Sequence, residues 1–187
     1  TIPPAPKIQT IPSDIEKMAD QLLAAKNPLV LTEAAGQEVE TYEALVGLCE
    51  LLALPLIEKP GALFANFPKD HPLHQGHDVQ PFWDDMDLAL VIRTRVPWYP
   101  PSQRPPNATV AIIDEEPHRA SMVYQSLQAD LYLEGYAART LQDLTKVLKS
   151  RKLDKEAIEN RRSALAKSHD ELMAKKMALY KNVENLS

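Results

Sequence analysis

Short apolar runs alternate along most of the chain with stretches whose apolar residues recur every three or four positions. The short runs are bounded by proline, glycine, asparagine or aspartate, which is typical of buried strands. We expect these strands at residues 29–32, 55–57, 88–93, 109–113 and 130–133. The longer stretches have the period of amphipathic helices, which we expect over 13–26, 37–52 and 137–149.

The strand runs are largely apolar and do not alternate with polar residues, so both faces of each strand are expected to be buried. Strands of this kind, separated by helices, are typical of a parallel sheet that is covered on both faces. The right-handed crossover rule leaves few ways to connect them. We therefore predict the α/β class, with a Rossmann-like doubly wound parallel sheet of about five to six strands and a C-terminal amphipathic helix.

The segment before the first helix has a different composition. Residues 1–12 hold four prolines and no apolar period, so we interpret them as an extended linker from a preceding domain. Ser13 is predicted to cap the first helix, and Glu16 would complete a capping box. The central Rossmann-like domain is then expected to cover residues 13–149.

Residues 150–187 are expected to form a C-terminal connector helix. Charged residues crowd this segment, which lacks glycine and proline, and its apolar residues recur every seven positions, at Ile158, Leu165, Leu172 and Leu179. A narrow apolar seam favours packing on another domain or subunit. We expect this helix to lie outside the core of the sheet domain, so that deleting residues 151–187 leaves that domain folded.

Composition excludes several classes of protein. The chain has 187 residues, 44% of them hydrophobic and 25% charged, which is typical of a globular domain. Its net charge of −5 argues against nucleic acid or an anionic membrane as the main partner. No apolar run reaches the length of a membrane span, and no signal peptide is visible. The single cysteine, Cys49, is expected to be buried, and its use suits a reducing cytosol.

Side chains that could carry chemistry are few, and we predict no catalytic residue. Asp114, Glu115 and Glu116 could supply acid and base groups, but we interpret them as the polar end of a strand and a helix start. No metal site is expected, although three histidines recur every three residues beside two aspartates. Pro72 would break any helix that could align these side chains, which are Asp70, His71, His74, His77 and Asp78.

Six stretches, in this order, resemble the central domain of acetolactate-synthase-like, thiamine-diphosphate-dependent enzymes. They are LLAAKNPLVLTEAAG (22–36), LPLIEKPGA (54–62), KDHPLHQGHD (69–78), MDLALVIRTR (86–95), TVAIIDEEPH (109–118) and ADLYLEGYAARTLQDL (129–144). The segment VPWYPPSQRPP (96–106) looks like one subgroup of this family.

The resemblance implies that the chemistry belongs to other domains. Thiamine diphosphate and Mg²⁺ lie between the first and third domains of such enzymes, held by a Gly-Asp-Gly and Asn-Asn motif that this sequence lacks. This chain is therefore expected to bind neither by itself. Its expected partners are the flanking domains of the parent chain, in a homo-oligomer, with cytoplasmic localisation.

Some relatives bind FAD or an adenine nucleotide in the central domain, and the matching positions here form a candidate nucleotide crevice at Gly36, Arg95 and Asp114. FAD is not expected, because three positions depart from the pattern. Glu33 would repel phosphate, while Arg93 replaces the family's strand-end glycine and Tyr136 its aspartate. The arginines could bind a smaller phosphate-bearing anion. We favour pairing of Arg93 and Arg95 with Glu33 or Asp114.

The resulting hypothesis is a structural and oligomerisation domain of a 2-oxo acid decarboxylase or carboligase that is not catalytic alone. One alternative is a freestanding Rossmann-like nucleotide-binding protein, against which the scarcity of glycines counts. Another is an interaction module that acts through the C-terminal helix. Flanking segments with the diphosphate motif downstream would distinguish the first hypothesis from the other two.

Overall fold

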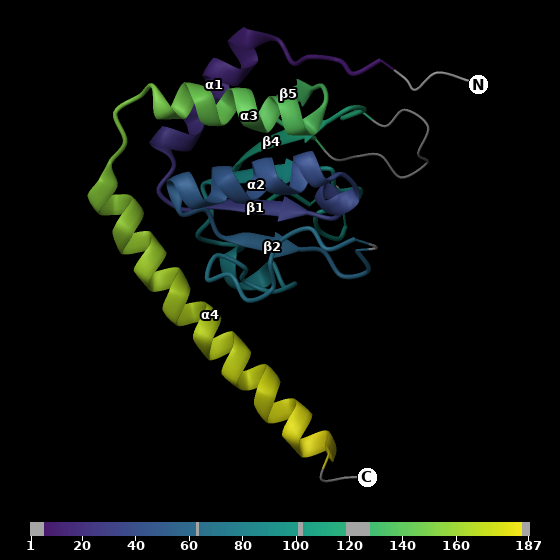
Figure 1. Cartoon of the computed structure of the whole chain (residues 1–187), viewed down its shortest axis with the longest axis vertical. Coiled ribbons are helices and arrows are strands. Elements are labelled where there is room, and N and C mark those ends of the chain that lie inside the picture. Colours follow the sequence, from purple (N-terminus) through teal and green to yellow (C-terminus); the bar gives the residue numbers. More distant parts are fainter. Residues whose placement is uncertain (1–5, 63, 101–102, 119–127, 185–187) are drawn as a thin grey trace, which may run out of the picture.

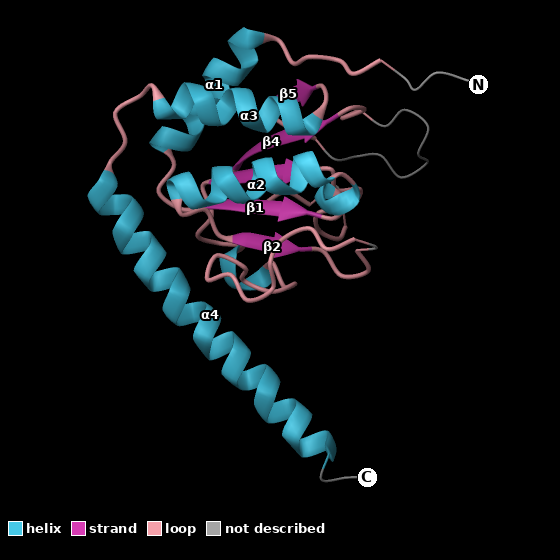
Figure 2. Ribbon diagram, in the orientation of Figure 1, coloured by secondary structure: helices cyan, strands magenta, loops and turns pink. Residues whose placement is uncertain are grey.

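The structure, a computed structural model, describes residues 6–62, 64–100, 103–118 and 128–184 (Figures 1 and 2). Five parallel strands form one sheet in the order β2-β1-β3-β4-β5. They are β1 (Pro28–Thr32), β2 (Leu56–Glu58), β3 (Leu88–Ile92), β4 (Thr109–Asp114) and β5 (Leu131–Glu134). The predicted parallel α/β fold is confirmed, and the strand order places the point where the winding reverses between β1 and β3.

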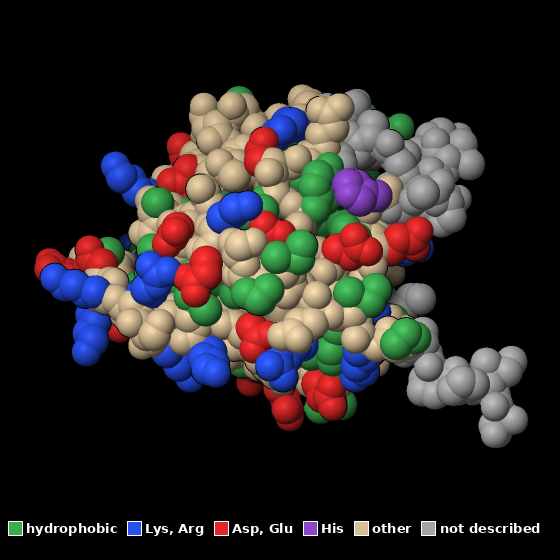
Figure 3. Space-filling model, turned by 90° about the horizontal axis from the view of Figure 1, so that it is seen from above, with side chains coloured by type: hydrophobic (Ala, Val, Ile, Leu, Met, Phe, Trp, Pro, Cys, Tyr) green, Lys and Arg blue, Asp and Glu red, His purple; other side chains and the backbone are tan. Residues whose placement is uncertain are grey.

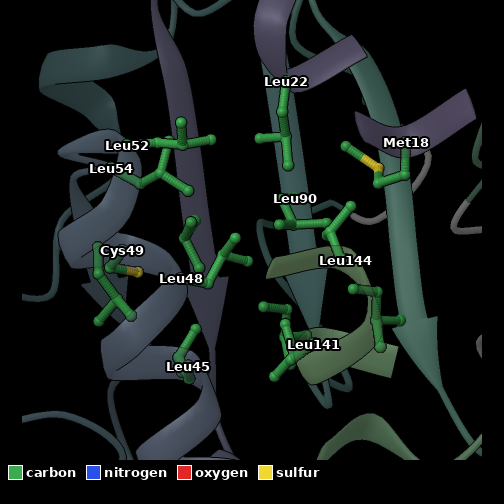
Figure 4. Packing of buried hydrophobic residues seen from close by; sticks show 14 of the residues in the cluster. Met18, Leu22, Leu45, Leu48, Cys49, Leu52, Leu54, Leu90, Leu141 and Leu144 are labelled. Atoms are coloured by element: carbon green, nitrogen blue, oxygen red, sulfur yellow. The ribbon is translucent and has the colours of Figure 1, made fainter. Parts of the chain in front are cut away.

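Three α-helices cover one face of the sheet. They are α1 (Pro12–Ala24), α2 (Val39–Leu52) and α3 (Ala137–Lys149). Met18, Leu22, Leu48 and Leu144 of these helices belong, with Leu90 of the sheet, to the main core (Figure 4). Complete burial of each such side chain contributes about 1.5–3 kcal/mol, so this layer provides much of the stability of the domain.

The opposite face is covered differently. In the part of the chain that the structure describes, the 3₁₀ helix η2 (Gln80–Phe82) and neighbouring loops cover it in place of α-helices. Leu31, Val91 and Ile112 form one row across the sheet and belong to this second core. Trp98 is buried there, and its ring packs edge-to-face on Trp83 at 5.7 Å. The proline-rich loop thus packs on its own domain.

The first helix begins without a side-chain cap. Ile11 occupies the cap position and Pro12 the first turn, and no side chain bonds to the free amides. The predicted capping box of Ser13 and Glu16 is therefore wrong. Proline, whose fixed φ suits the first helical turn, moves the start of the helix before Ser13.

The segment before α1 is tied to the domain from residue 6 onward. Thr10 is buried, and its hydroxyl lies 2.7 Å from the Thr140 hydroxyl and donates to the Glu134 carbonyl at 3.0 Å. The Ile8 carbonyl accepts from the Tyr136 amide at 2.8 Å. This part of the expected linker is extended, but it is fastened to the turn between β5 and α3.

Helix α4 (Lys155–Glu184) runs diagonally past the domain (Figure 1). Leu165 belongs to the main core, and Ile158 packs against it. Arg161 donates to three carbonyls that precede β1 and β2, those of Lys26, Leu52 and Ala53, at 2.8–3.1 Å. The prediction that this helix lies apart from the core is wrong for its first half. That half packs on the main core and on the segments that lead into the amino ends of β1 and β2.

The last part of α4 is exposed, whereas Leu172 and Met173 are half-buried. Leu179, the last position of the predicted seam, is 66% exposed, and Met177 and Tyr180 are also exposed. The seam therefore changes from buried to open along its length. In the described residues, no helix is long and apolar enough to cross a membrane.

Candidate functional site

The carboxyl edge of the sheet at the β1–β3 switch point is where doubly wound folds bind ligands. Two loops meet there, one after β1 at Glu33 and one after β3 at Arg93. The Ala34 amide donates to the Arg93 carbonyl at 3.1 Å, which joins the two loops directly. The side chains of these two loops therefore decide whether the candidate nucleotide crevice is open to a ligand.

Arg95 is held by Glu33. Its backbone amide donates to one Glu33 carboxylate oxygen at 2.9 Å and its Nε to the other at 2.7 Å, and Nη2 also contacts the carboxylate. These bonds raise the pKa of Arg95 above its ordinary value. The interpretation that Arg95 pairs with Glu33 is confirmed. A phosphate at this point would have to displace a carboxylate that already makes a charge-assisted, forked contact.

Arg93 is likewise directed to its own chain. Its guanidinium donates to Glu38 at 3.2 Å and to Gln37 at 2.9 Å, and its Nε lies 3.7 Å from a Glu115 oxygen. The residue has φ 45°, in the left-handed region. Glycine adopts this conformation without strain, which accounts for glycine at this position in the resembling family.

Gly36 faces the loop that follows β2. Its amide donates to the Asn66 side chain at 2.9 Å. Asn66 is buried and donates to the Glu33 carbonyl and to the Glu58 carboxylate, each at 2.9 Å. The sequence assigned Gly36 to close approach of a phosphate. In the structure, the Gly36 amide bonds to the Asn66 side chain. The absence of a side chain on Gly36 leaves room for the backbone of residues 65–66.

Replacing Gly36 with alanine is expected to lower the free energy of unfolding by about 2 kcal/mol, because overpacking against rigid backbone costs roughly 1–3 kcal/mol. A Cβ at this position would press into the Ala65 carbonyl group. Gly47→Ala is the matched control, since nothing lies within 4 Å of the added methyl group within α2. That change should stabilise by about 0.5–1 kcal/mol through helix propensity. Urea unfolding of both variants measures the difference, and equal effects would contradict this role of Gly36.

Asp114 ends β4 and supports two turns. Its carboxylate accepts from the Glu116 amide at 3.0 Å, and its carbonyl accepts from Gly135 at 3.0 Å. Glu115 accepts from the Ala137 amide at 3.4 Å, in the first turn of α3. Residues 115–118 form bends and a turn, and the residues that would continue the predicted helix lie outside the described part of the chain. A carboxylate of the chain thus lies at the helix N-terminus, where anions are favoured.

Tyr136, which precedes α3, is the third position that departs from the family pattern. Its hydroxyl donates to Glu40 at 2.5 Å, and the ammonium group of Lys7 lies 3.7 Å from the centre of its ring. The Tyr136 hydroxyl and the Lys7 ammonium lower the pKa of Glu40. Lys7 of the N-terminal segment thereby covers the ring of Tyr136, which stands where the resembling family has an aspartate. The sequence showed the replacement by Tyr136 but not the segment that fastens it.

The profile of the family described as "Thiamine pyrophosphate enzyme, central domain" matches residues 15–144. The chain belongs to this family. The match confirms the resemblance seen in the sequence, which ran over nearly the same residues.

Solved structures share the fold of this central domain. One is a candidate thiamin diphosphate-dependent enzyme from Mycobacterium smegmatis, with a TM-score of 0.69, 21% identity and coverage of 83% of this chain and 31% of the other. Another is benzoylformate decarboxylase from Polynucleobacter necessarius, with a TM-score of 0.65, 22% identity and coverage of 79% and 29%. The central domain thus spans about a third of the length of these chains. No curated protein matches its sequence.

Two histidines of the central domain, His74 and His77, contact Glu58. The imidazole of His77 donates to the Glu58 carbonyl at 2.7 Å, and that of His74 lies 3.4 Å from the Glu58 carboxylate. From α4, His169 donates to the His74 carbonyl at 2.7 Å. The described residues contain no group of three or more histidine, cysteine or acidic side chains that could hold a metal ion. Sequence spacing did not reveal His169, which lies far along the chain.

Proposed function

We infer that this chain is a structural domain within a thiamine-diphosphate-dependent enzyme, and that it neither catalyses nor holds FAD itself. The observation that carries this proposal is the filling of the switch-point crevice by Glu33–Arg95 and by the contacts of Arg93 with Glu38 and Glu115. Each partner of the two arginines is a group of the domain itself. Opening the crevice for a pyrophosphate would break these contacts and place the carboxylates beside a like charge.

The parent reaction that we propose is decarboxylation or carboligation of a 2-oxo acid by an acetolactate-synthase-like enzyme. The family match supports a thiamine-dependent parent, and one solved structure of the same fold is a decarboxylase. Thiamine diphosphate and Mg²⁺ would be held by the flanking domains, and this domain would contribute to assembly of a homo-oligomer. A cytosolic location suits Cys49, which is buried and whose thiol pKa burial raises.

The surface of the domain agrees with protein partners. On the face drawn in Figure 3, acidic and basic side chains are interspersed and are not separated by sign. With a net charge of −5, this favours contacts between domains over binding of a polyanion.

The proposal is tested with the purified chain. We expect no release of carbon dioxide from pyruvate in the presence of thiamine diphosphate and Mg²⁺. We also expect no rise in melting temperature with FAD, although a ligand at a hundredfold its Kd adds about 2.7 kcal/mol. The Arg95→Gln variant serves as the control for nonspecific anion effects. FAD-dependent stabilisation that disappears in this variant would show that the crevice binds a nucleotide, and turnover above a protein-free blank would overturn the structural assignment.

A further inference from the structure

A groove lies between α4 and the loop that follows β2. Its volume is about 200 Å³. That is smaller than the roughly 300–1,000 Å³ of pockets for drug-sized ligands, so an occupant must be small. The loop lines it with Lys69, His74, Gly76 and His77, and α4 lines it with Leu172, Met173, Lys175, Lys176 and Leu179.

The apolar part of the groove is built where the helix meets the loop. Gly76 has φ 88°, and a Cβ there would lie 3.1 Å from a methyl group of Leu172. Leu172 therefore packs directly on the glycine backbone. Met173 and Leu179, which also line the groove, extend this apolar surface along the same side of α4.

The polar part of the groove carries positive charge on its lysines. Lys69, Lys175 and Lys176 line it together with the imidazoles of His74 and His77. Burial and the nearby Lys176 ammonium lower the pKa of Lys69. Burial, Lys69 and Lys176 lower that of His77. Lys69 and Lys176 thus repel each other and disfavour protonation of His77, and a bound negative charge would relieve that repulsion.

The carboxylate that contacts this group is already engaged. Glu58 is buried at the end of β2 and contacts Lys69 and His74. Its Oε1 also accepts from the Asn66 amide at 3.3 Å and from the Asn66 side chain at 2.9 Å. One carboxylate serves several donors, while Lys175 and Lys176 stand on the opposite wall. The charge of the groove is therefore only partly balanced by Glu58.

We propose that this groove binds a small organic oxyanion, a carboxylate or a phosphate that carries a short apolar group. The negatively charged oxygens would lie between Lys69 and Lys176, and the apolar group would lie on Leu172 and Leu179. Charge-assisted hydrogen bonds from lysine to such oxygens are stronger than neutral ones. Since the site bridges α4 and the sheet domain, its occupancy would also hold the second half of the helix against the loop.

The test uses the chain with two separate probes, inorganic phosphate and isobutyrate, each added at constant ionic strength against sodium chloride. NMR of the imidazole protons follows the pKa of His77, which should rise when an anion binds beside it. Saturable binding of phosphate or of isobutyrate identifies the preferred head group. The double variant Lys175→Gln/Lys176→Gln should weaken binding by about tenfold or more, the loss that goes with one charge-assisted hydrogen bond.

Lys167→Gln is the matched control, because Lys167 is exposed on α4 and does not line the groove. It should bind the probe as the parent chain does. Two results would overturn the proposal. One is a His77 response in which neither probe differs from chloride. The other is an affinity that falls equally in the control and in the double variant, which would indicate general screening.

Discussion

Deleting residues 151–187 is expected to lower the free energy of unfolding by about 4 kcal/mol while leaving a cooperative melt. Burial of Leu165 contributes roughly 1.5–3 kcal/mol, and Ile158 adds a part of that amount. Arg161 adds its bonds to Leu52 and Ala53, which cover the carbonyl end of α2. A domain has about 5–15 kcal/mol in total, so the sheet domain should remain folded but with a clearly lower melting temperature.

A shorter truncation provides the control. Removing residues 177–187 deletes exposed side chains, among them Met177 and Tyr180, and should change stability by less than about 0.5 kcal/mol. Urea unfolding of the three chains, followed by circular dichroism, measures both differences. If both truncations had the same small effect, the packing of Leu165 and Arg161 would contribute nothing. If the longer truncation abolished the cooperative transition, the boundary of the sheet domain would lie beyond residue 150.

Stability is expected to fall steeply between pH 6.5 and pH 4 because of His74. Burial lowers the pKa of His74 to about 4, and Lys69, His77, His169 and Lys176 act in the same direction. The unfolded chain binds this proton near pH 6.5, so in this window it holds more protons than the folded chain. The stabilisation is therefore complete above pH 6.5 and is lost as pH falls towards 4. At 1.36 kcal/mol per pKa unit, the full loss is about 3 kcal/mol.

Urea unfolding at pH 7.5, 6.5, 5.5 and 4.5 gives the slope. His74→Gln should flatten it, because glutamine does not titrate in this range. His118→Gln is the control, since this side chain is exposed and should leave the slope unchanged. His77, whose pKa is also lowered, acts in the same direction, so a smaller slope should remain in the His74 variant. Parallel curves for the parent chain and His74→Gln would exclude His74 as the source.

The strands were predictable from the sequence because a parallel strand is buried on both faces. Runs such as 88–92 and 110–113 are apolar without interruption and carry the information locally. The pairing of Glu33 with Arg95 could be anticipated as well. Both residues follow central strands, and parallel neighbours bring their carboxyl ends to the same edge. Local patterning therefore sufficed for the sheet and for this part of the crevice.

Other features depend on contacts that local pattern does not encode. The seam of α4 indicated that one side of the helix would be covered, but not that its own domain covers Leu165. The bonds of Arg161 join residues more than 100 positions apart. The capping box failed because its signal at Ser13 competes with Pro12, which begins the helix earlier. In each case, the deciding interaction comes from tertiary packing or from a competing local preference.

The two ends of the domain are held at opposite sides of the sheet. The segment around Thr10 is fixed at the β5–α3 turn, on the carboxyl side of the sheet, while Arg161 fixes α4 on the amino side. A helix of 30 residues extends about 45 Å at 1.5 Å per residue. Bodies joined to the two ends of the domain would therefore start from opposite sides of the sheet, and α4 would set one of them apart by its length.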